Sequence, residues 1–228
     1  MTELKDILHT IRAETGTASC LNDDRDEVLK EEIERQRLEY KSKQAERLWL
    51  ESNVGKRFDH ATFDSYTGDS GALKACMDWA EICEEGTGLV LCGSYGVGKT
   101  HLAVACMRKV MELYGLTIYF NTFAGMLHEL KSAYGKPDAY SRAMAKYKQV
   151  DLLVIDDLGK ENMTEWGREI LFNVIDERYR NMKSLIITTN LMPTELGKHI
   201  DEAIMSRLGQ MCKFVKVTGD DYRLRGKK

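Results

Sequence analysis

Eight consecutive residues near the middle of the chain have the types and spacing that surround a phosphate group. The segment GSYGVGKT, from Gly93 to Thr100, fits the pattern G-x-x-x-x-G-K-[ST] without departure. Glycines let the backbone turn tightly enough for its N–H groups to face a phosphate, and the following helix N-terminus adds partial positive charge. The predicted nucleotide-contacting residues are Gly93, Ser94, Tyr95, Gly96, Val97, Gly98, Lys99, Thr100 and His101.

Four side chains in two motifs suit a nucleoside triphosphate and its metal ion. Lys99 is expected to reach the β- and γ-phosphates, and Thr100 to offer its hydroxyl to Mg²⁺. The apolar run LLVI ends in Asp156 and Asp157. Asp156 suits the metal, and Asp157 could orient or deprotonate an attacking water. The pattern therefore predicts ATP and Mg²⁺ as cofactors and ATP hydrolysis as the reaction.

A further polar residue, Asn190, follows the apolar run SLIITT. Its amide could hydrogen-bond the attacking water or the γ-phosphate. An asparagine before Leu-Met-Pro is also an ordinary turn residue, so spacing alone leaves both interpretations open.

The order of apolar segments predicts the fold that must position these residues. Strands are expected at 88–92, 116–120, 151–155, 184–189 and near 212–217. Helical periodicity covers 98–114, a segment ending at about 133, and 164–182. Strands that alternate with helices indicate an α/β fold with a five-stranded parallel sheet covered on both faces. Both acidic residues then lie at the carboxyl edge, where such sheets bind ligands.

Residues 1–57 have a different composition from the rest, with 11 basic and 13 acidic side chains. An apolar stripe at helical spacing comprises Leu4, Ile7, Leu8 and Ile11, and residues 24–52 suggest a longer solvated helix. We predict a helical arm at 1–57 and a catalytic domain at 58–228. The stripe either packs on the protein's own body or docks in a groove of a partner.

Composition limits the classes of protein that remain. The 228 residues include 33 basic and 36 acidic side chains, a net charge of −3. The chain has no apolar run that could span a membrane and no pattern of a signal peptide, which predicts a soluble cytoplasmic protein without a membrane partner. Its six cysteines form no Cys-x-x-Cys pair, so we expect no structural zinc and expect Cys92 and Cys106 to be buried thiols.

The motifs GSYGVGKT, LLVIDDLG, TTN, IMSRL and DYR occur in the order found in AAA+ ATPases of the DnaC/IstB type. The resemblance runs from Phe58 to Arg225 and implies an AAA+ P-loop NTPase with a helical N-terminal extension. It implies that Asn190 is the sensor-1 residue and that Arg207 is an arginine finger offered to a neighbouring subunit. Arg223 is the implied sensor-2 arginine, with Arg225 as the alternative.

The resemblance has one departure, because the usual Asp-Glu pair at the metal-binding strand is Asp156-Asp157 here. The shorter acid leads to the hypothesis of slow hydrolysis, stimulated by DNA or by assembly, with ATP acting chiefly as an assembly switch. The segment RFDHATFDSY resembles the family segment that passes near the adenine. Phe58, Phe63 and Tyr66 are therefore expected either beside the base or in packing roles.

Between residues 131 and 148 lie five cations and one acid, with three tyrosines interleaved. Cations that follow a phosphate backbone and aromatic faces on which bases stack are typical of single-strand binding. The predicted DNA-binding residues are Lys131, Tyr134, Lys136, Arg142 and Lys146. In the resembled family an added helical element occupies this place. The alternative is a solvated basic helix with tyrosines in the core.

The resemblance favours an ATP-dependent loader of a replicative hexameric helicase, of a phage or prophage type, that binds single-stranded DNA. Residues 1–57 would contact the helicase, and an arginine finger requires an ATP-dependent homo-oligomer. Two alternatives remain at this point. One is an IstB-like transposition helper ATPase that engages duplex DNA and a transposase, and the other is a non-catalytic ATP-switch adaptor.

Overall fold

The computed structural model describes residue 35 and residues 46–159 and 163–224. In this part of the chain, five parallel strands form one sheet in the order β2-β3-β4-β1-β5. The strands are β1 (Gly88–Cys92), β2 (Ile118–Thr122), β3 (Leu152–Leu158), β4 (Ser184–Thr189) and β5 (Cys212–Lys216). The predicted α/β fold with a five-stranded parallel sheet is confirmed.

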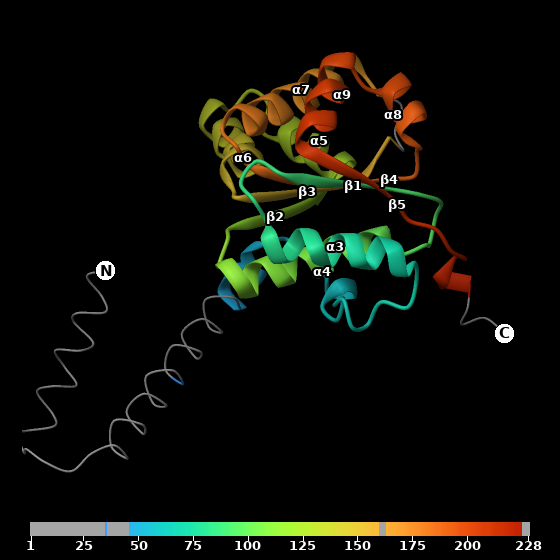
Figure 1. Ribbon diagram of the computed structural model, residues 1–228. Coiled ribbons are helices and arrows are strands. Elements are labelled where there is room, and N and C mark those ends of the chain that lie inside the picture. Colours follow the sequence, from blue (N-terminus) through green and yellow to red (C-terminus); the bar gives the residue numbers. More distant parts are fainter. Residues whose placement is uncertain (1–34, 36–45, 160–162, 225–228) are drawn as a thin grey trace, which may run out of the picture. The chain divides into compact units, whose positions relative to one another are not determined.

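Helices cover both faces of the sheet (Figure 1). On one face lie α3 (Ser70–Ile82) and α4 (Lys99–Tyr114). The other face carries α5 (Phe123–Ser132), α6 (Pro137–Gln149), α7 (Glu165–Arg180), α8 (Pro193–His199) and α9 (Glu202–Met211). Short 3-10 helices are η1 (Lys56–Phe58) and η2 (Tyr222–Leu224). Among the described residues, the helices are too short or too polar to cross a bilayer.

Alternating side chains of the buried strands fill two apolar cores. In β1, Leu89 and Leu91 pack towards α3 and α4, whereas Val90 and Cys92 pack towards the other helical layer. Strands buried on both faces need continuous apolar runs, and this is the composition of GLVLC and SLIITT. Cys92 and Cys106 are both free and buried, as the sequence predicts.

The structure corrects some predicted element boundaries. Strand β2 begins at Ile118 rather than at residue 116, because Thr117 instead bonds the Asp151 carboxylate through its N–H and hydroxyl. Strand β3 runs on to Leu158, three residues beyond the predicted end. The short or weakly patterned helices α3, α8 and α9 were not predicted. In α9, the buried residues Ile204, Leu208 and Met211 do stand at helical spacing, but ten residues show only two such intervals.

The segment just before Phe58 covers the β2 edge of the sheet. Residues 46–51 are helical, and Leu48 and Trp49 contact the core beneath α3 and α4. The Phe120 N–H donates to Ser52 O at 2.7 Å, and the Asn53 side chain donates to Phe120 O at 2.9 Å. These bonds satisfy polar groups on the outer edge of β2, which would otherwise be open to pairing with another strand. The predicted N-terminal stripe and most of the predicted long helix lie outside the described residues.

One buried arginine joins the start of two strands to two helices. Arg178 is fully buried and donates to the carbonyl oxygens of Tyr147 and Asp151, both at 3.0 Å, and of Ser184 at 2.5 Å. Burial lowers the pKa of its guanidinium to about 9, although the nearby Asp151 charge opposes that shift. A single side chain therefore supplies donors to carbonyls at the ends of α6, β3 and β4.

Replacing Arg178 by alanine should remove those donors and leave a cavity. We expect Arg178→Ala to lower the free energy of unfolding by about 3 kcal/mol, since each unsatisfied buried carbonyl costs about 1–3 kcal/mol. Urea-induced unfolding measures this change. The matched control is Arg180→Ala in the same helix, whose side chain is 62% exposed and whose ion pairs are worth at most about 1 kcal/mol. Equal losses in the two variants would contradict the proposed role of Arg178.

Candidate functional site

The carboxyl ends of three strands meet beside a cavity of about 490 Å³. The first turn of α4, which follows the loop after β1, contributes Lys99 and Thr100, and Asn190 follows β4. Asp157, near the end of β3, also lines the cavity, and Asp156 bonds Thr100 next to it. The sheet thus brings the predicted phosphate, metal and water-contacting residues to one place.

Two glycines allow the phosphate loop to follow its path. Gly98 has φ of 94°, in the left-handed region, and a Cβ there would lie 2.6 Å from the Tyr66 ring. A Cβ on Gly93 would lie 2.1 Å from the carbonyl oxygen of Val217. The first glycine is required by backbone conformation and contact, and the second by a close approach of two backbones.

The Lys99 ammonium lies at the centre of the site and has three acceptors. It donates to the carbonyls of Gly93 at 2.8 Å and Ser94 at 2.7 Å, and to Asn190 Oδ1 at 2.7 Å. Burial lowers the pKa of Lys99, and the charges of Asp157 and Asp156 oppose this shift. Asn190 therefore contacts the phosphate-loop lysine directly, which a plain turn residue would not do.

Asp156 has the chemistry and position of a magnesium ligand. The Thr100 hydroxyl donates to its Oδ1 at 2.8 Å, and the Thr188 hydroxyl donates to the same oxygen at 2.5 Å. Burial raises the pKa of Asp156, and the two hydroxyls oppose this. Within the described residues, His, Cys, Asp and Glu form no group of three that could hold a metal. One carboxylate and one hydroxyl still fit Mg²⁺, which keeps water and phosphate oxygens as its other ligands.

The second acid of the pair has an unusual backbone. Asp157 has φ of 56°, and the pairing of β3 with β4 shifts register between Ile155 and Leu158. Its N–H donates to the Thr188 hydroxyl at 3.0 Å. Left-handed backbone at a residue with a side chain costs free energy and is concentrated at functional sites. The irregularity turns Asp157 towards the cavity instead of continuing the alternation of the strand.

The wall opposite the acids comes from the segment before α3. Phe58 and Tyr66 line the cavity, and the Tyr66 hydroxyl donates to Val97 O at 3.2 Å. His101 Nε2 donates to Thr62 O at 2.8 Å and so ties this segment to α4. Phe63 does not line the cavity but packs on the core beneath α3 and α4. Phe58 and Tyr66 pack on the same core, so all three aromatics have a packing role and two of them also line the cavity.

The C-terminal segment closes another side of the cavity. Arg223 lines the cavity, and the Tyr222 N–H donates to Gly96 O in the phosphate loop at 3.0 Å. The Asp69 carboxylate caps α3 and also accepts hydrogen bonds from the N–H and hydroxyl of Thr218. Arg223 thus lies in the same cavity as the phosphate loop, and its sensor-2 role stays a prediction. Arg225, the alternative, lies outside the described residues.

Arg207 does not line this cavity. It lies on α9 and forms an ion pair with Asp176 of α7, with Nη2 to Oδ1 at 2.6 Å. A residue that serves a neighbouring subunit would lie outside its own nucleotide site, and a residue in a structural ion pair would do so as well. The position of Arg207 therefore fits both roles, and the arginine finger stays a prediction.

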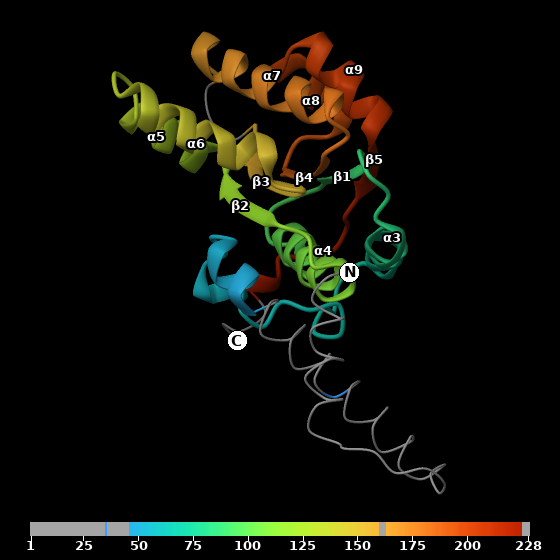
Figure 2. The same cartoon turned by 90° about the vertical axis from the view of Figure 1, so that its left-hand side faces the viewer.

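The predicted DNA-binding residues lie along the α5–α6 hairpin, which Figure 2 shows at one end of the sheet. Lys131, Lys136 and Arg142 are exposed, and Tyr134 is 75% exposed. Lys146 is paired with Glu129 of α5 at 2.7 Å. The other interleaved tyrosines belong to the core: Tyr147 is fully buried, and Tyr140 packs against that core. The hairpin therefore presents three cations and one aromatic ring, a smaller set than the sequence suggests.

Sequence reasoning missed Thr188, which contacts both acids of the site. The residue lies in TTN, two positions before Asn190, and the alternation of a strand directs it towards the neighbouring strand end. Asp69 and Thr218 were also missed because their contact joins positions 149 residues apart.

Comparisons with known proteins agree with this architecture. The family of IstB-like ATP-binding proteins matches residues 12–228. The uncharacterized protein YqaM of Bacillus subtilis is 30% identical over 200 residues, which is 80% of this chain and 63% of YqaM. The replicative helicase loader DnaC of Escherichia coli is 25% identical over 195 residues, covering 82% of this chain and 79% of DnaC. The chain spans 63% and 58% of the first two curated relatives that it matches, YqaM and the phage-like element protein XkdC of B. subtilis.

Solved structures show the same fold. The crystal structure of a DnaC helicase loader is 31% identical, with a TM-score of 0.65, over 72% of this chain and 100% of that one. The DnaI structure is 22% identical with a TM-score of 0.64, over 73% of this chain and 95% of that chain. The fold is that of an AAA+ P-loop NTPase, with the phosphate loop between β1 and α4.

The Thr188 hydroxyl offers a test of the metal site. We expect Thr188→Val, which keeps the side-chain shape, to weaken Mg²⁺-dependent ATP binding by about 10- to 100-fold, as is typical when a partner of a metal ligand is lost. Thr188→Ser keeps the hydroxyl and should bind nearly as the wild type does. Titration with a fluorescent ATP analogue, with and without Mg²⁺, measures both. Equal Mg²⁺ dependence in the valine and serine variants would exclude this role.

Proposed function

The chain belongs to the family of IstB-like ATP-binding proteins, and we propose that it is an ATPase that loads a replicative DNA helicase onto single-stranded DNA. The observation that carries this proposal is the match to a DnaC helicase loader structure, whose whole chain is covered at 31% identity. The cavity at the ends of β1, β3 and β4 supports the ATPase part, because Lys99, Asp157 and Asn190 line it together, and Asp156 lies beside it through its bond with Thr100.

Each polar residue at the cavity has a separate role in the proposed hydrolysis of ATP. Lys99 exchanges its carbonyl partners for phosphate oxygens when ATP binds, since a buried ammonium needs acceptors in either state. Thr100 and Asp156 would hold Mg²⁺, which would supply positive charge against the phosphates. Asp157 orients the attacking water or accepts its proton, and Asn190 fixes that water by hydrogen bonding. An aspartate in place of the usual glutamate reaches less far, so basal turnover is slow.

Assembly completes the site. Arg223 acts on the nucleotide of its own subunit, because it lines the same cavity as Lys99. Arg207 lies outside that cavity and acts on the nucleotide of the adjacent subunit, where its charge stabilises the transferred phosphoryl group. The active form is therefore an ATP-dependent homo-oligomer in which each nucleotide contacts two subunits.

The α5–α6 hairpin supplies the contact with single-stranded DNA. Lys131, Lys136 and Arg142 are exposed cations, and Tyr134 offers a face for base stacking. The net charge of −3 makes strong binding by a lone subunit unfavourable, so affinity arises when assembly aligns several hairpins.

The arm within residues 1–57 engages the helicase through the part that precedes residue 46, since residues 46–53 pack on the sheet, and residues 58–228 form the rest of the ATPase domain. The proposal for the arm comes from the apolar stripe in the sequence, which lies outside the described residues. A stripe of only four apolar side chains is too small to form a core of its own, but it is large enough to dock in a groove on a partner.

Removing the hairpin charges should weaken DNA binding and reduce its salt dependence. For the combined variant Lys131→Gln, Lys136→Gln and Arg142→Gln, the slope of log affinity against log salt should fall by about 2, at about 0.7 per phosphate contact. Fluorescence anisotropy with a labelled oligonucleotide measures the slope. The control removes three exposed cations elsewhere, at Lys56, Lys74 and Lys216. An unchanged slope in the hairpin variant, or an equal fall in the control, would place the DNA site elsewhere.

Charges placed in the apolar stripe should abolish helicase binding while ATP binding persists. We expect full-length Leu8→Asp with Ile11→Asp to lose retention of a hexameric helicase in a pull-down. Thr10→Asp with Ala13→Asp adds the same charge off the stripe and should retain it. Parallel pull-downs use a transposase as the competing partner. Retention of the transposase instead of the helicase would replace the loader proposal with a transposition helper.

A further inference from the structure

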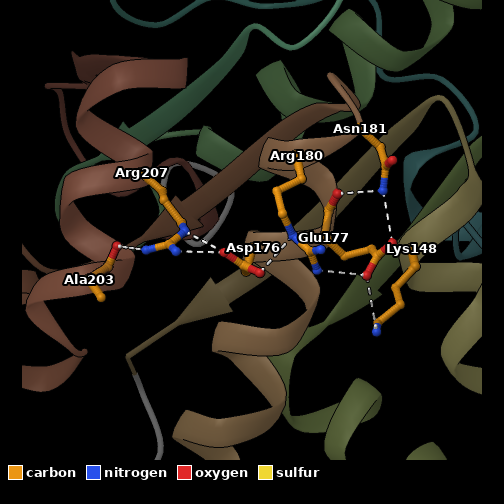
Figure 3. Close-up of polar contacts among 7 residues, drawn as sticks. All are labelled: Lys148, Asp176, Glu177, Arg180, Asn181, Ala203 and Arg207. Atoms are coloured by element: carbon orange, nitrogen blue, oxygen red, sulfur yellow. Dashed lines mark hydrogen bonds and ion pairs between the residues drawn. The ribbon is translucent and has the colours of Figure 1, made fainter.

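The guanidinium of Arg207 is held in place by a set of contacts (Figure 3). Its Nε donates to Asp176 Oδ1 at 2.8 Å, and its Nη2 lies 2.6 Å from the same oxygen. Its Nη1 donates to Ala203 O at 3.0 Å, one turn earlier in α9. All three nitrogens of the side chain are therefore tied to fixed groups on α7 and α9.

Aromatic rings fix the plane of the same side chain. The Arg207 guanidinium carbon lies 4.9 Å from the centre of the Phe172 ring and 5.8 Å from that of the Tyr179 ring. The side chain is nevertheless 26% exposed. A guanidinium carries five N–H groups, and the contacts to Asp176 and Ala203 use three of them. Donors remain for a group that approaches from outside the subunit.

Asp176 is itself fixed on both of its oxygens. Its Oδ1 takes Arg207, and its Oδ2 accepts from Arg180 Nε at 2.9 Å. Burial opposes ionisation, but hydrogen bonds and charges from Arg207 and Arg180 hold the pKa of Asp176 below its usual value. The carboxylate therefore stays charged at neutral pH and keeps its hold on Arg207.

We propose that Asp176 is a positioning residue that holds Arg207 ready for the nucleotide of a neighbouring subunit. The inference rests on the proposed function, in which Arg207 acts across the subunit boundary. A long, solvated arginine would have to lose its conformational freedom at the moment of reaction. An arginine already held by Asp176 and Ala203 has lost that freedom on folding, so its charge is organised before the transition state forms.

The neighbouring acid of α7 provides a matched control. Glu177 pairs with Arg180 at 3.2 Å and with Lys148 of α6 at 3.8 Å, whereas Arg207 pairs with Asp176 (Figure 3). Glu177→Gln removes one negative charge from the same helix turn as an Asp176 variant does. A general effect of surface charge or of α7 stability would therefore appear in both variants.

The test compares full-length Asp176→Ala, Asp176→Asn, Arg207→Ala and Glu177→Gln in ATPase assays with single-stranded DNA. We expect Asp176→Ala to lower kcat by about a hundredfold, as misplacement of a catalytic group does. Asp176→Asn keeps an acceptor oxygen and should lose less, and Glu177→Gln should match the wild type. The affinity for ATP should stay unchanged in all four, because the subunit's own cavity is intact.

Mixed assemblies distinguish positioning from misfolding. A Lys99→Ala subunit lacks a working nucleotide site but keeps Arg207 and Asp176, so mixing it with Asp176→Ala subunits should restore activity above the average of the two. Mixing Asp176→Ala with Arg207→Ala should restore nothing, since both lack a positioned arginine. A misfolded Asp176→Ala subunit would not be rescued by either partner.

The outcomes separate this inference from the function on which it rests. Wild-type turnover by Arg207→Ala would overturn the trans-acting arginine and its positioning residue together. A large loss in Arg207→Ala with full activity in Asp176→Ala would overturn only the role of Asp176. Equal losses in Asp176→Ala and Glu177→Gln, or no rescue by Lys99→Ala, would also overturn it.

Discussion

The 2.8 Å hydrogen bond between Thr100 and Asp156 joins two segments that are not neighbours in the sheet. Strand β4 lies between β1 and β3, and Thr188 of β4 also bonds Asp156. The carboxyl ends of β1, β4 and β3 must therefore be aligned along the strand direction. Only then can Thr100, which follows β1, reach the Asp156 carboxylate on β3. The apolar core on both faces fixes that alignment, because a slip of one residue would turn every buried side chain to the opposite layer.

Local patterns predicted the parts of the site whose chemistry is written in adjacent residues. The phosphate loop, the Asp156-Asp157 pair and the positions of all five strands, to within three residues, follow from short runs of sequence, since backbone conformation and burial are local there. Contacts between distant segments could not be found in this way. Thr188 looked like any strand threonine, and nothing near Phe63 in the sequence indicates that it stays out of the cavity that Phe58 lines.

The charge pattern of residues 131–148 was the least reliable guide to the surface, because a count of cations does not reveal which of them form ion pairs. Five cations in residues 131–148 suggest a uniform basic surface, yet Lys146 is paired with Glu129, and Lys148 lies 3.8 Å from Glu177. Arg178 is buried among backbone carbonyls and adds nothing to the surface charge. The tyrosines behave similarly: Tyr134 is exposed, whereas Tyr147 donates to Glu129 inside the core. The alternation of basic and aromatic residues thus reflects an amphipathic helix as well as a binding face.

Lys99 and Arg207 have different surroundings. These surroundings explain how, in the proposed function, Lys99 would contact the nucleotide of its own subunit and Arg207 that of a neighbouring subunit. Lys99 is buried against oxygen atoms of its own loop, so a phosphate can reach it only through the cavity. Arg207 is held by Asp176 at the surface of a different helical layer and keeps donors open to the outside. Bending Arg207 towards its own cavity would break an ion pair and two ring contacts at once. If Arg207 acts on a phosphate, as we propose, the contacts that fix it within one subunit leave an approaching subunit as the source of that phosphate.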